Sequence, residues 1–95
     1  MKKFVLVLLL VLSSTVYSDG MSLYKSSCFA CHDQGVAGSP KFGDIEQWKP
    51  RIATGIDAMV KTVITGKGAM PPNGGTQLTE SQIREVVEYM ANSAK

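Results

Sequence analysis

The sequence has little net charge, and this excludes two classes of partner. Ten Lys and Arg residues oppose eight Asp and Glu residues among 95 positions. Lys2 and Lys3 stand near the N-terminus, and without them eight basic residues (ten minus two) balance the eight acidic ones. A neutral domain lacks the basic surface of a nucleic-acid-binding protein or of a segment that binds acidic lipids. We therefore expect neither nucleic acid nor an acidic lipid surface as a partner.

The sequence also lacks an apolar run long enough to cross a membrane. Its leading run, Phe4–Leu12, has nine residues, whereas a transmembrane helix needs about 20. Two lysines precede this run and Val16-Tyr17-Ser18 follows it, an arrangement typical of a secretory signal peptide. We expect residues 1–18 to be cleaved and residues 19–95 to be exported to the periplasm without stable membrane insertion. An uncleaved membrane anchor is the alternative.

Strand-like alternation of apolar and polar residues is missing from residues 19–95, so we predict an all-α domain of four to five helices. The first helix begins near Gly20 and ends near His32. Asp44 is placed to cap a second, short helix from Ile45, in which Pro50 either kinks the helix or starts a new turn.

Two later segments have clear helical patterns. Residues 56–65 carry one apolar side, and Gly66 ends them. The last helix begins at a capping-box pair, Thr79 and Gln82. Its apolar stripe repeats at helical spacing and is interpreted as core packing rather than a partner groove. The stripe consists of Ile83, Val86, Val87 and Met90.

Both cysteines and the only histidine lie in one pentapeptide, Cys28-Phe29-Ala30-Cys31-His32. This C-x-x-C-H pattern is typical of covalent c-type haem attachment. Two thioethers would hold one haem through Cys28 and Cys31, and the imidazole of His32 would be the proximal ligand of its iron. A small domain of this length commonly needs such a cofactor to complete its core.

Three other interpretations of the motif explain its residues less well than haem attachment does. A zinc site normally needs four ligands, and only three soft candidates are present. A thioredoxin-like redox pair expects alternating strands and helices. A disulfide between Cys28 and Cys31 would close a very short loop, contribute little stability and leave His32 unexplained. Haem accounts for all three residues together.

The second axial ligand is sought among the methionines, because His/Met ligation raises the potential of an electron-carrying cytochrome. Met59 and Met90 lie in apolar helical stripes, where methionine usually fills the core, and Met21 is close to the mature N-terminus. Met70 lies in a Gly/Pro-rich loop, residues 66–75, that cannot continue a helix. We predict Met70 as the ligand; a buried loop residue that only fills the core is the alternative.

Three further residues are candidates for supporting the cofactor. The carbonyl of Pro40, in a Gly/Pro-rich segment after the motif, is a candidate acceptor for the second ring N–H of His32. Trp48 and Arg51 could donate hydrogen bonds to haem propionates. Either could instead be structural, with Trp48 as a core anchor and Arg51 as a surface cation.

Together these residues resemble the class I c-type cytochromes, and most closely the bacterial monohaem cytochrome c5 group. The resemblance covers nearly the whole of residues 19–95. It implies thioethers at Cys28 and Cys31, axial ligands His32 and Met70, and a crossing of the first and last helices around an apolar haem pocket. Some members carry a further cysteine pair before the last helix, which is absent here. The matching segments are Leu23-Tyr24, Cys28-Phe29-Ala30-Cys31-His32, Ser39-Pro40-Lys41-Phe42-Gly43-Asp44, Trp48-Lys49-Pro50-Arg51-Ile52, Gly66-Lys67-Gly68-Ala69-Met70-Pro71-Pro72 and Glu88-Tyr89-Met90.

The resemblance implies a periplasmic one-electron carrier rather than an enzyme. Its donor would be a quinol-oxidising complex or another cytochrome, and its acceptor a terminal oxidase, a reductase or a dihaem peroxidase. Two alternatives remain: a haem-based gas sensor or peroxidase-like enzyme in which Met70 dissociates, and a haem-free exported thiol protein.

Overall fold

The structure is a computed structural model that describes residues 20–95, and the predicted signal peptide at residues 1–18 lies outside the described residues. Within residues 20–95 the chain forms helices and turns and no strand, which confirms the predicted all-α class. The only strand-like pairing in this part is an isolated bridge between Lys67 and Met70. None of the described helices is long and apolar enough to span a bilayer.

The first helical segment is continuous but irregular. It consists of α1 (Gly20–Leu23), a π-helical turn η1 (Tyr24–Cys28) and α2 (Phe29–His32). The segment ends at His32, as predicted. The π turn was not predicted, because one wider turn shifts the register without changing which residue types are apolar. Such turns insert one extra residue and are frequent at functional sites.

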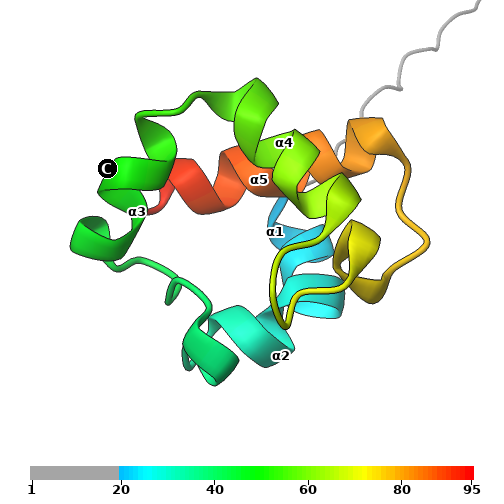
Figure 1. Cartoon of the computed structure of the whole chain (residues 1–95), viewed down its shortest axis with the longest axis horizontal. Helices are drawn as coiled ribbons and strands as arrows, with labels where there is room; N and C mark the ends of the chain where they lie inside the picture. Colours follow the sequence, from blue (N-terminus) through cyan, green and yellow to red (C-terminus); the bar gives the residue numbers. More distant parts are fainter. Residues whose placement is uncertain (1–19) are drawn as a thin grey trace, which may run out of the picture.

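The first and last helices pack closely against each other, which confirms the crossing that the resemblance implies. α1 lies against α5 (Glu80–Asn92), as Figure 1 shows. Gly20 stands at the contact, where an added Cβ would come 2.7 Å from the carbonyl oxygen of Glu85 and would also collide with Tyr89. A larger residue at position 20 would therefore separate the two helices.

The two central helices begin where the sequence predicted, and α4 also ends there. α3 (Ile45–Ile52) begins at Asp44, whose side chain accepts a hydrogen bond from the N–H of Gln47. Pro50 lies inside α3 and does not end it. α4 (Ile56–Thr65) runs between Gly55 and Gly66, both of which have positive φ. Those conformations favour glycine and so fix both ends of α4.

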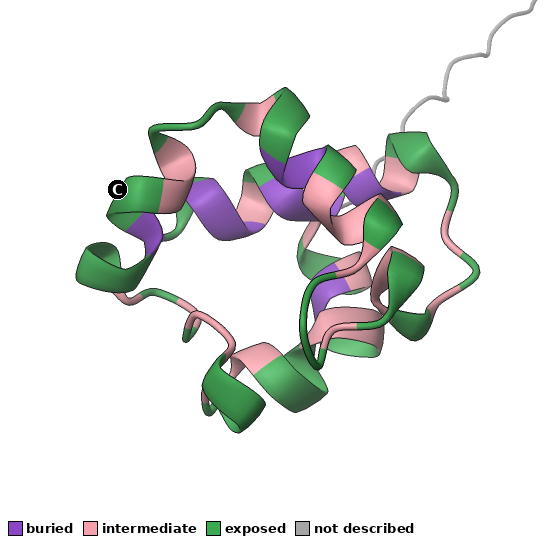
Figure 2. Cartoon of the chain, viewed as in Figure 1, coloured by how far each residue is buried: buried purple, intermediate pink, exposed green. Residues whose placement is uncertain are grey.

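α5 supplies five of the ten buried hydrophobic residues among the described ones, more than any other helix. The capping box of Thr79 and Gln82 is present in both directions, which confirms the predicted start. The four predicted stripe residues are each at most 4% exposed, and they pack with Met59 and Val60 of α4. Figure 2 shows the buried positions concentrated on α5 and the side of α4 that faces it. Two short 3-10 turns, η2 (Val36–Gly38) and η3 (Pro72–Gly75), lie in the connections.

Candidate haem site

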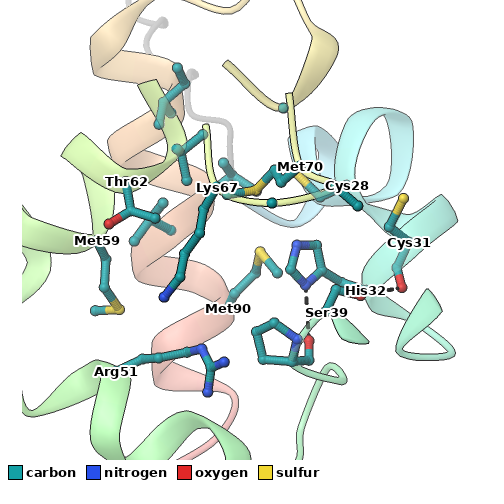
Figure 3. A pocket seen from close by; sticks show the side chains of 18 of the residues that line it. Cys28, Cys31, His32, Ser39, Arg51, Met59, Thr62, Lys67, Met70 and Met90 are labelled. Atoms are coloured by element: carbon teal, nitrogen blue, oxygen red, sulfur yellow. Dashed lines mark hydrogen bonds between the residues drawn. The ribbon is translucent and has the colours of Figure 1, made fainter. Parts of the chain in front are cut away.

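A cavity of about 770 Å³ separates the first helical segment from the loop that carries Met70. Its volume is in the range of cofactor pockets. In Figure 3 the motif side chains enter from the first helical segment and Met70 enters from the loop. The fold thus brings together every residue selected from the sequence. The cavity is lined by Cys28, Cys31, His32, Pro40, Trp48, Arg51 and Met70.

The two thiols are free and face the cavity. Cys28 is half-buried and Cys31 is exposed, and they form no disulfide with each other. Burial is the main cause that raises the pKa of the Cys28 thiol, and the nearby Cys31 adds to the effect. Both thiols therefore stand unpaired at the cavity, where they are available for thioether bonds.

The imidazole of His32 is oriented by a hydrogen bond to Pro40. Nδ1 of the ring lies 2.9 Å from the carbonyl oxygen of Pro40, which confirms the contact predicted from the sequence. Since a carbonyl can only accept, Nδ1 carries the proton and Nε2 keeps its lone pair. The N–H of Phe42 donates to the carbonyl of His32 at 2.7 Å and ties the same segments together a second time. This is the tautomer that a metal-bound histidine uses.

Ser39 holds the loop before Pro40 against the motif. Its Oγ lies 2.8 Å from the carbonyl oxygens of both Cys31 and Val36. The loop includes Ala37 at φ 56°, a left-handed conformation that costs a residue with a side chain about 1–2 kcal/mol. The packing around the motif therefore holds this loop in a specific path.

Trp48 is placed differently from the sequence-based expectation of a propionate donor. The residue is 5% exposed, and its indole N–H donates to the carbonyl of Lys41 at 2.9 Å. That is the only N–H of an indole, so it is already used within the chain. The ring centroid lies 6.2 Å from that of His32. Trp48 therefore serves as a wall of the cavity and as a contact to the segment beyond Pro40.

Arg51 retains the capacity to bind an anionic group. It is half-buried at the cavity, and one guanidinium nitrogen donates to the carbonyl of Gln47. A guanidinium has five N–H groups, so this bond leaves other donors available.

Met70 lies at the end of a tight turn. The backbone N–H and C=O groups of Lys67 and Met70 bond to each other at 2.8 and 2.9 Å. Gly66 makes the turn possible, because an added Cβ would come 2.8 Å from the nitrogen of Pro72 and 2.9 Å from the carbonyl oxygen of Met70. The half-buried Met70 is therefore positioned by backbone geometry.

Two methionines interpreted as core residues have a second role. Met59 and Met90 are buried, at 8% and 4% exposed, as predicted. Both also line the cavity, together with His32, and both are labelled in Figure 3. A helical stripe identifies a buried face but does not distinguish contact with other helices from contact with a cofactor, so the sequence did not reveal this role.

The donor set fits a covalently bound haem. The cavity offers two free thiols separated by two residues, one imidazole nitrogen with a free lone pair and one thioether, in a largely apolar setting. Among residues 20–95 there is no cluster of three or more His, Cys, Asp and Glu residues that could hold a metal ion by themselves.

Comparisons with known proteins agree with this site. Residues 15–90 match a family model described as cytochrome C oxidase, cbb3-type, subunit III. The chain is 42% identical over 81 residues to cytochrome c-555 of Chlorobaculum tepidum, covering 80% of this chain and 75% of that one. It is 39% identical over 67 residues to cytochrome c5 of Ectopseudomonas mendocina, covering 67% and 77%.

A solved structure supports the same assignment. It is described as an electron transfer complex of nitrite reductase with cytochrome c; the match has a TM-score of 0.79, 50% identity and coverage of 80% of this chain and 94% of that one. With the haem motif and the helical fold, these similarities show that the chain belongs to the class I c-type cytochromes, electron-transfer proteins with one covalent haem, and that it is close to the cytochrome c5 group.

Proposed function

We propose that this cytochrome shuttles single electrons between redox partners in the periplasm, with its haem attached to Cys28 and Cys31 and its iron held by His32 and Met70. One observation carries the ligand assignment. His32 has its Nδ1 proton bound to Pro40, and Met70 enters the same cavity from the opposite loop. The haem, when bound, supplies the interchange between ferrous and ferric iron.

The two axial residues would act in different ways. His32 offers a neutral nitrogen that the Pro40 contact makes more basic, which favours the ferric state. Met70 offers a soft, uncharged sulfur, which favours the ferrous state and raises the potential. If His32 and Met70 both hold the iron, no position would be left on it for a substrate, so this pair would favour electron transfer over sensing or peroxide chemistry.

Other side chains would keep the site dry and hold the haem edge. The ring of Trp48 and the thioethers of Met59 and Met90 contribute to the apolar wall. We assign the propionate-binding role to Arg51 and not to Trp48, since the indole N–H already bonds to Lys41. A guanidinium can bind a carboxylate through two parallel hydrogen bonds.

An apolar surface beside the motif suits brief contact with a partner. Phe29 and Val36 are 48% and 50% exposed, and Cys31 lies between them in the sequence and is exposed. Electron-transfer encounters use small, weak interfaces. A quinol-oxidising complex or another cytochrome would donate the electron; a terminal oxidase, a reductase or a dihaem peroxidase would accept it. The structural relative in complex with nitrite reductase supports a reductase as acceptor.

Optical spectroscopy of the exported, purified protein tests the ligand set. We expect haem that stays bound after denaturation, sharp low-spin bands on reduction, and the weak red band of ferric iron bound to methionine sulfur. Sequencing the N-terminus of the same sample tests cleavage after residue 18. A high-spin ferric spectrum would contradict Met70 ligation and favour the sensor or peroxidase-like alternative, and loss of all haem on denaturation would contradict thioether attachment.

A further inference from the structure

Residues at the start of α3 form hydrogen bonds with both the N–H and the C=O of Lys41. Lys41 follows Pro40, whose carbonyl accepts from His32. The N–H of Lys41 donates to Oε1 of Gln47 at 2.8 Å. The carbonyl of Lys41 accepts from the indole N–H of Trp48 at 2.9 Å and from the N–H of Asp44 at 3.0 Å. These contacts link α3 to the segment that orients the histidine, although none of them touches His32 itself.

One of these bonds lies on the same peptide plane as the contact to His32. The carbonyl of Pro40 and the N–H of Lys41 belong to a single planar unit and point to opposite sides of it. His32 is bonded on one side and Gln47 on the other, at 2.9 and 2.8 Å. The proline ring fixes φ of residue 40, so the rotation that aims this carbonyl is mainly ψ. The Gln47 contact restrains that rotation.

The same bond changes the strength of the acceptor. A peptide whose N–H donates a hydrogen bond carries more negative charge on its oxygen, because consecutive hydrogen bonds polarise one another. A stronger acceptor draws the Nδ1 proton of His32 away from the ring and makes Nε2 a better donor to iron. A better nitrogen donor favours ferric iron and lowers the reduction potential.

We infer that Gln47 is a positioning residue for His32, acting through the Pro40–Lys41 peptide to set the donor strength of the proximal ligand and so the reduction potential, with Trp48 and Asp44 fixing the other side of Lys41. This inference rests on the proposed ligation by His32.

Gln47 is suited to a clean test because a substitution there changes few contacts besides the one to Lys41. The residue is exposed, and its backbone N–H donates to Oδ1 of Asp44, a bond that a substitution of the side chain retains. Methionine has nearly the same length and helix propensity as glutamine but no strong acceptor. Gln47→Met therefore removes the contact to Lys41 while α3 stays intact. Glutamate keeps the oxygen, so Gln47→Glu is the conservative variant.

The experiment uses the holoprotein in its reduced, diamagnetic state, labelled with ¹⁵N-histidine. The chain has one histidine, so only His32 is observed. NMR gives the shift and exchange rate of its Nδ1 proton, and a titration gives the midpoint potential. For Gln47→Met we expect an upfield shift, faster exchange and a higher potential. A weakened bond of this kind corresponds to about a two- to fivefold change in the redox equilibrium, which is about 20–40 mV at 59 mV per tenfold.

Three further variants separate positioning from general effects. Gln34→Met makes the same change at another exposed glutamine, whose side chain donates to Asp33, and should leave both readouts unchanged. Gln47→Glu should keep the Nδ1 proton at or downfield of its original shift. Trp48→Phe, which keeps a ring but lacks the N–H, should shift the proton in the same direction as Gln47→Met.

The possible results distinguish the inference from the function on which it rests. If Gln47→Met moves neither the Nδ1 proton nor the potential, the inference is wrong and the ligation stands. If the potential moves while the proton does not, Gln47 acts by another route and the inference is also wrong. If the ring protons of His32 in the unmodified protein show no shift from haem ring current, His32 is not a ligand, and the proposed function fails first.

Discussion

The two sides of the haem cavity are held by different means. The segment from the motif to α3 is fixed by bonds from side chains, which include those of His32 to Pro40, Ser39 to Cys31 and Trp48 to Lys41. The loop around Met70 is fixed by backbone geometry, through the Lys67–Met70 pair and the close approach at Gly66. The histidine side should therefore be the permanent attachment, and the methionine side the one that mutation or denaturant opens first.

Removing the histidine should have the largest effect. His32→Ala leaves the proximal position without a donor while the cavity still has both thiols. We expect the exported protein to contain little or no covalent haem and to be largely unfolded, because the site forms only when the chain closes over its cofactor. Haem staining after denaturing electrophoresis and circular dichroism measure the two effects.

The control for this variant changes a neighbouring position of the same motif. Phe29→Ala alters an exposed residue between the cysteines and should keep its haem. Equal haem content in His32→Ala and Phe29→Ala would contradict the proximal assignment.

Removing the methionine should have a smaller effect. Met70→Ala is expected to keep the haem, lose the sulfur band and bind carbon monoxide rapidly when reduced. Its potential should fall by more than a tenfold change in the redox equilibrium, about 59 mV. Met21→Ala is the matched control, because Met21 is 50% exposed and does not line the cavity. An unchanged potential in Met70→Ala would mean that another group holds the iron.

Substitutions at two glycines test whether backbone geometry fixes the loop that carries Met70. Gly66 and Gly68 both have positive φ, but only at Gly66 would a Cβ collide with the backbone, whereas nothing lies within 4 Å at Gly68. Gly66→Ala should therefore cost about 1–3 kcal/mol of unfolding free energy beyond Gly68→Ala. It should also weaken the sulfur band. Equal losses in denaturant titrations of the two variants would show that only the φ angle matters there.

The histidine side also depends on ring packing, which Tyr24 can test. Its ring centroid lies 4.5 Å from that of Phe42, and among the described residues its buried hydroxyl has no hydrogen-bond partner. Burial, with a smaller contribution from Asp33, raises the pKa of Tyr24 to about 12. A raised pKa gives stability that is present below the unfolded value near 10 and is lost as the pH rises toward 12.

Tyr24→Phe should remove this pH dependence and keep the packing. Between pH 9 and 11 the unmodified protein should lose about 1 kcal/mol more unfolding free energy than Tyr24→Phe. At pH 7 the variant should be more stable by about 1 kcal/mol, since a buried hydroxyl without a partner is removed. A destabilised variant at pH 7 would show that the hydroxyl, and not only the ring, supports the histidine side.

The sequence predicted the parts of this site that depend on local patterns. The spacing of Cys28, Cys31 and His32, the Gly/Pro loop around Met70 and the caps at Asp44 and Thr79 each lie within a few residues. The carbonyl of Pro40 was also predicted, because a ligating histidine usually donates its second ring N–H and the Gly/Pro-rich loop that follows the motif brings backbone carbonyls close to it.

Contacts between distant segments were not predicted, for physical reasons. The indole of Trp48 could donate to any acceptor within reach, and only the folded chain shows that Lys41 is nearest. A single exposed glutamine such as Gln47 has no periodicity or motif to mark it. The π turn at Tyr24–Cys28 changes the register of the helix without changing its composition.

The smallest predicted effect compares one residue from each side of the cavity. Ala37, on the histidine side, and Asn73, on the methionine side, both have positive φ, at 56° and 58°. Alanine there costs about 1–2 kcal/mol relative to glycine, whereas asparagine tolerates this conformation. Glycine adds about 0.4–1 kcal/mol of chain entropy to the unfolded state. Ala37→Gly should therefore raise the unfolding free energy by about 0.5 kcal/mol, and Asn73→Gly should lower it by about as much. Denaturant titrations of the two variants would measure this. A loss of unfolding free energy in both variants would mean that the left-handed conformation does not strain Ala37.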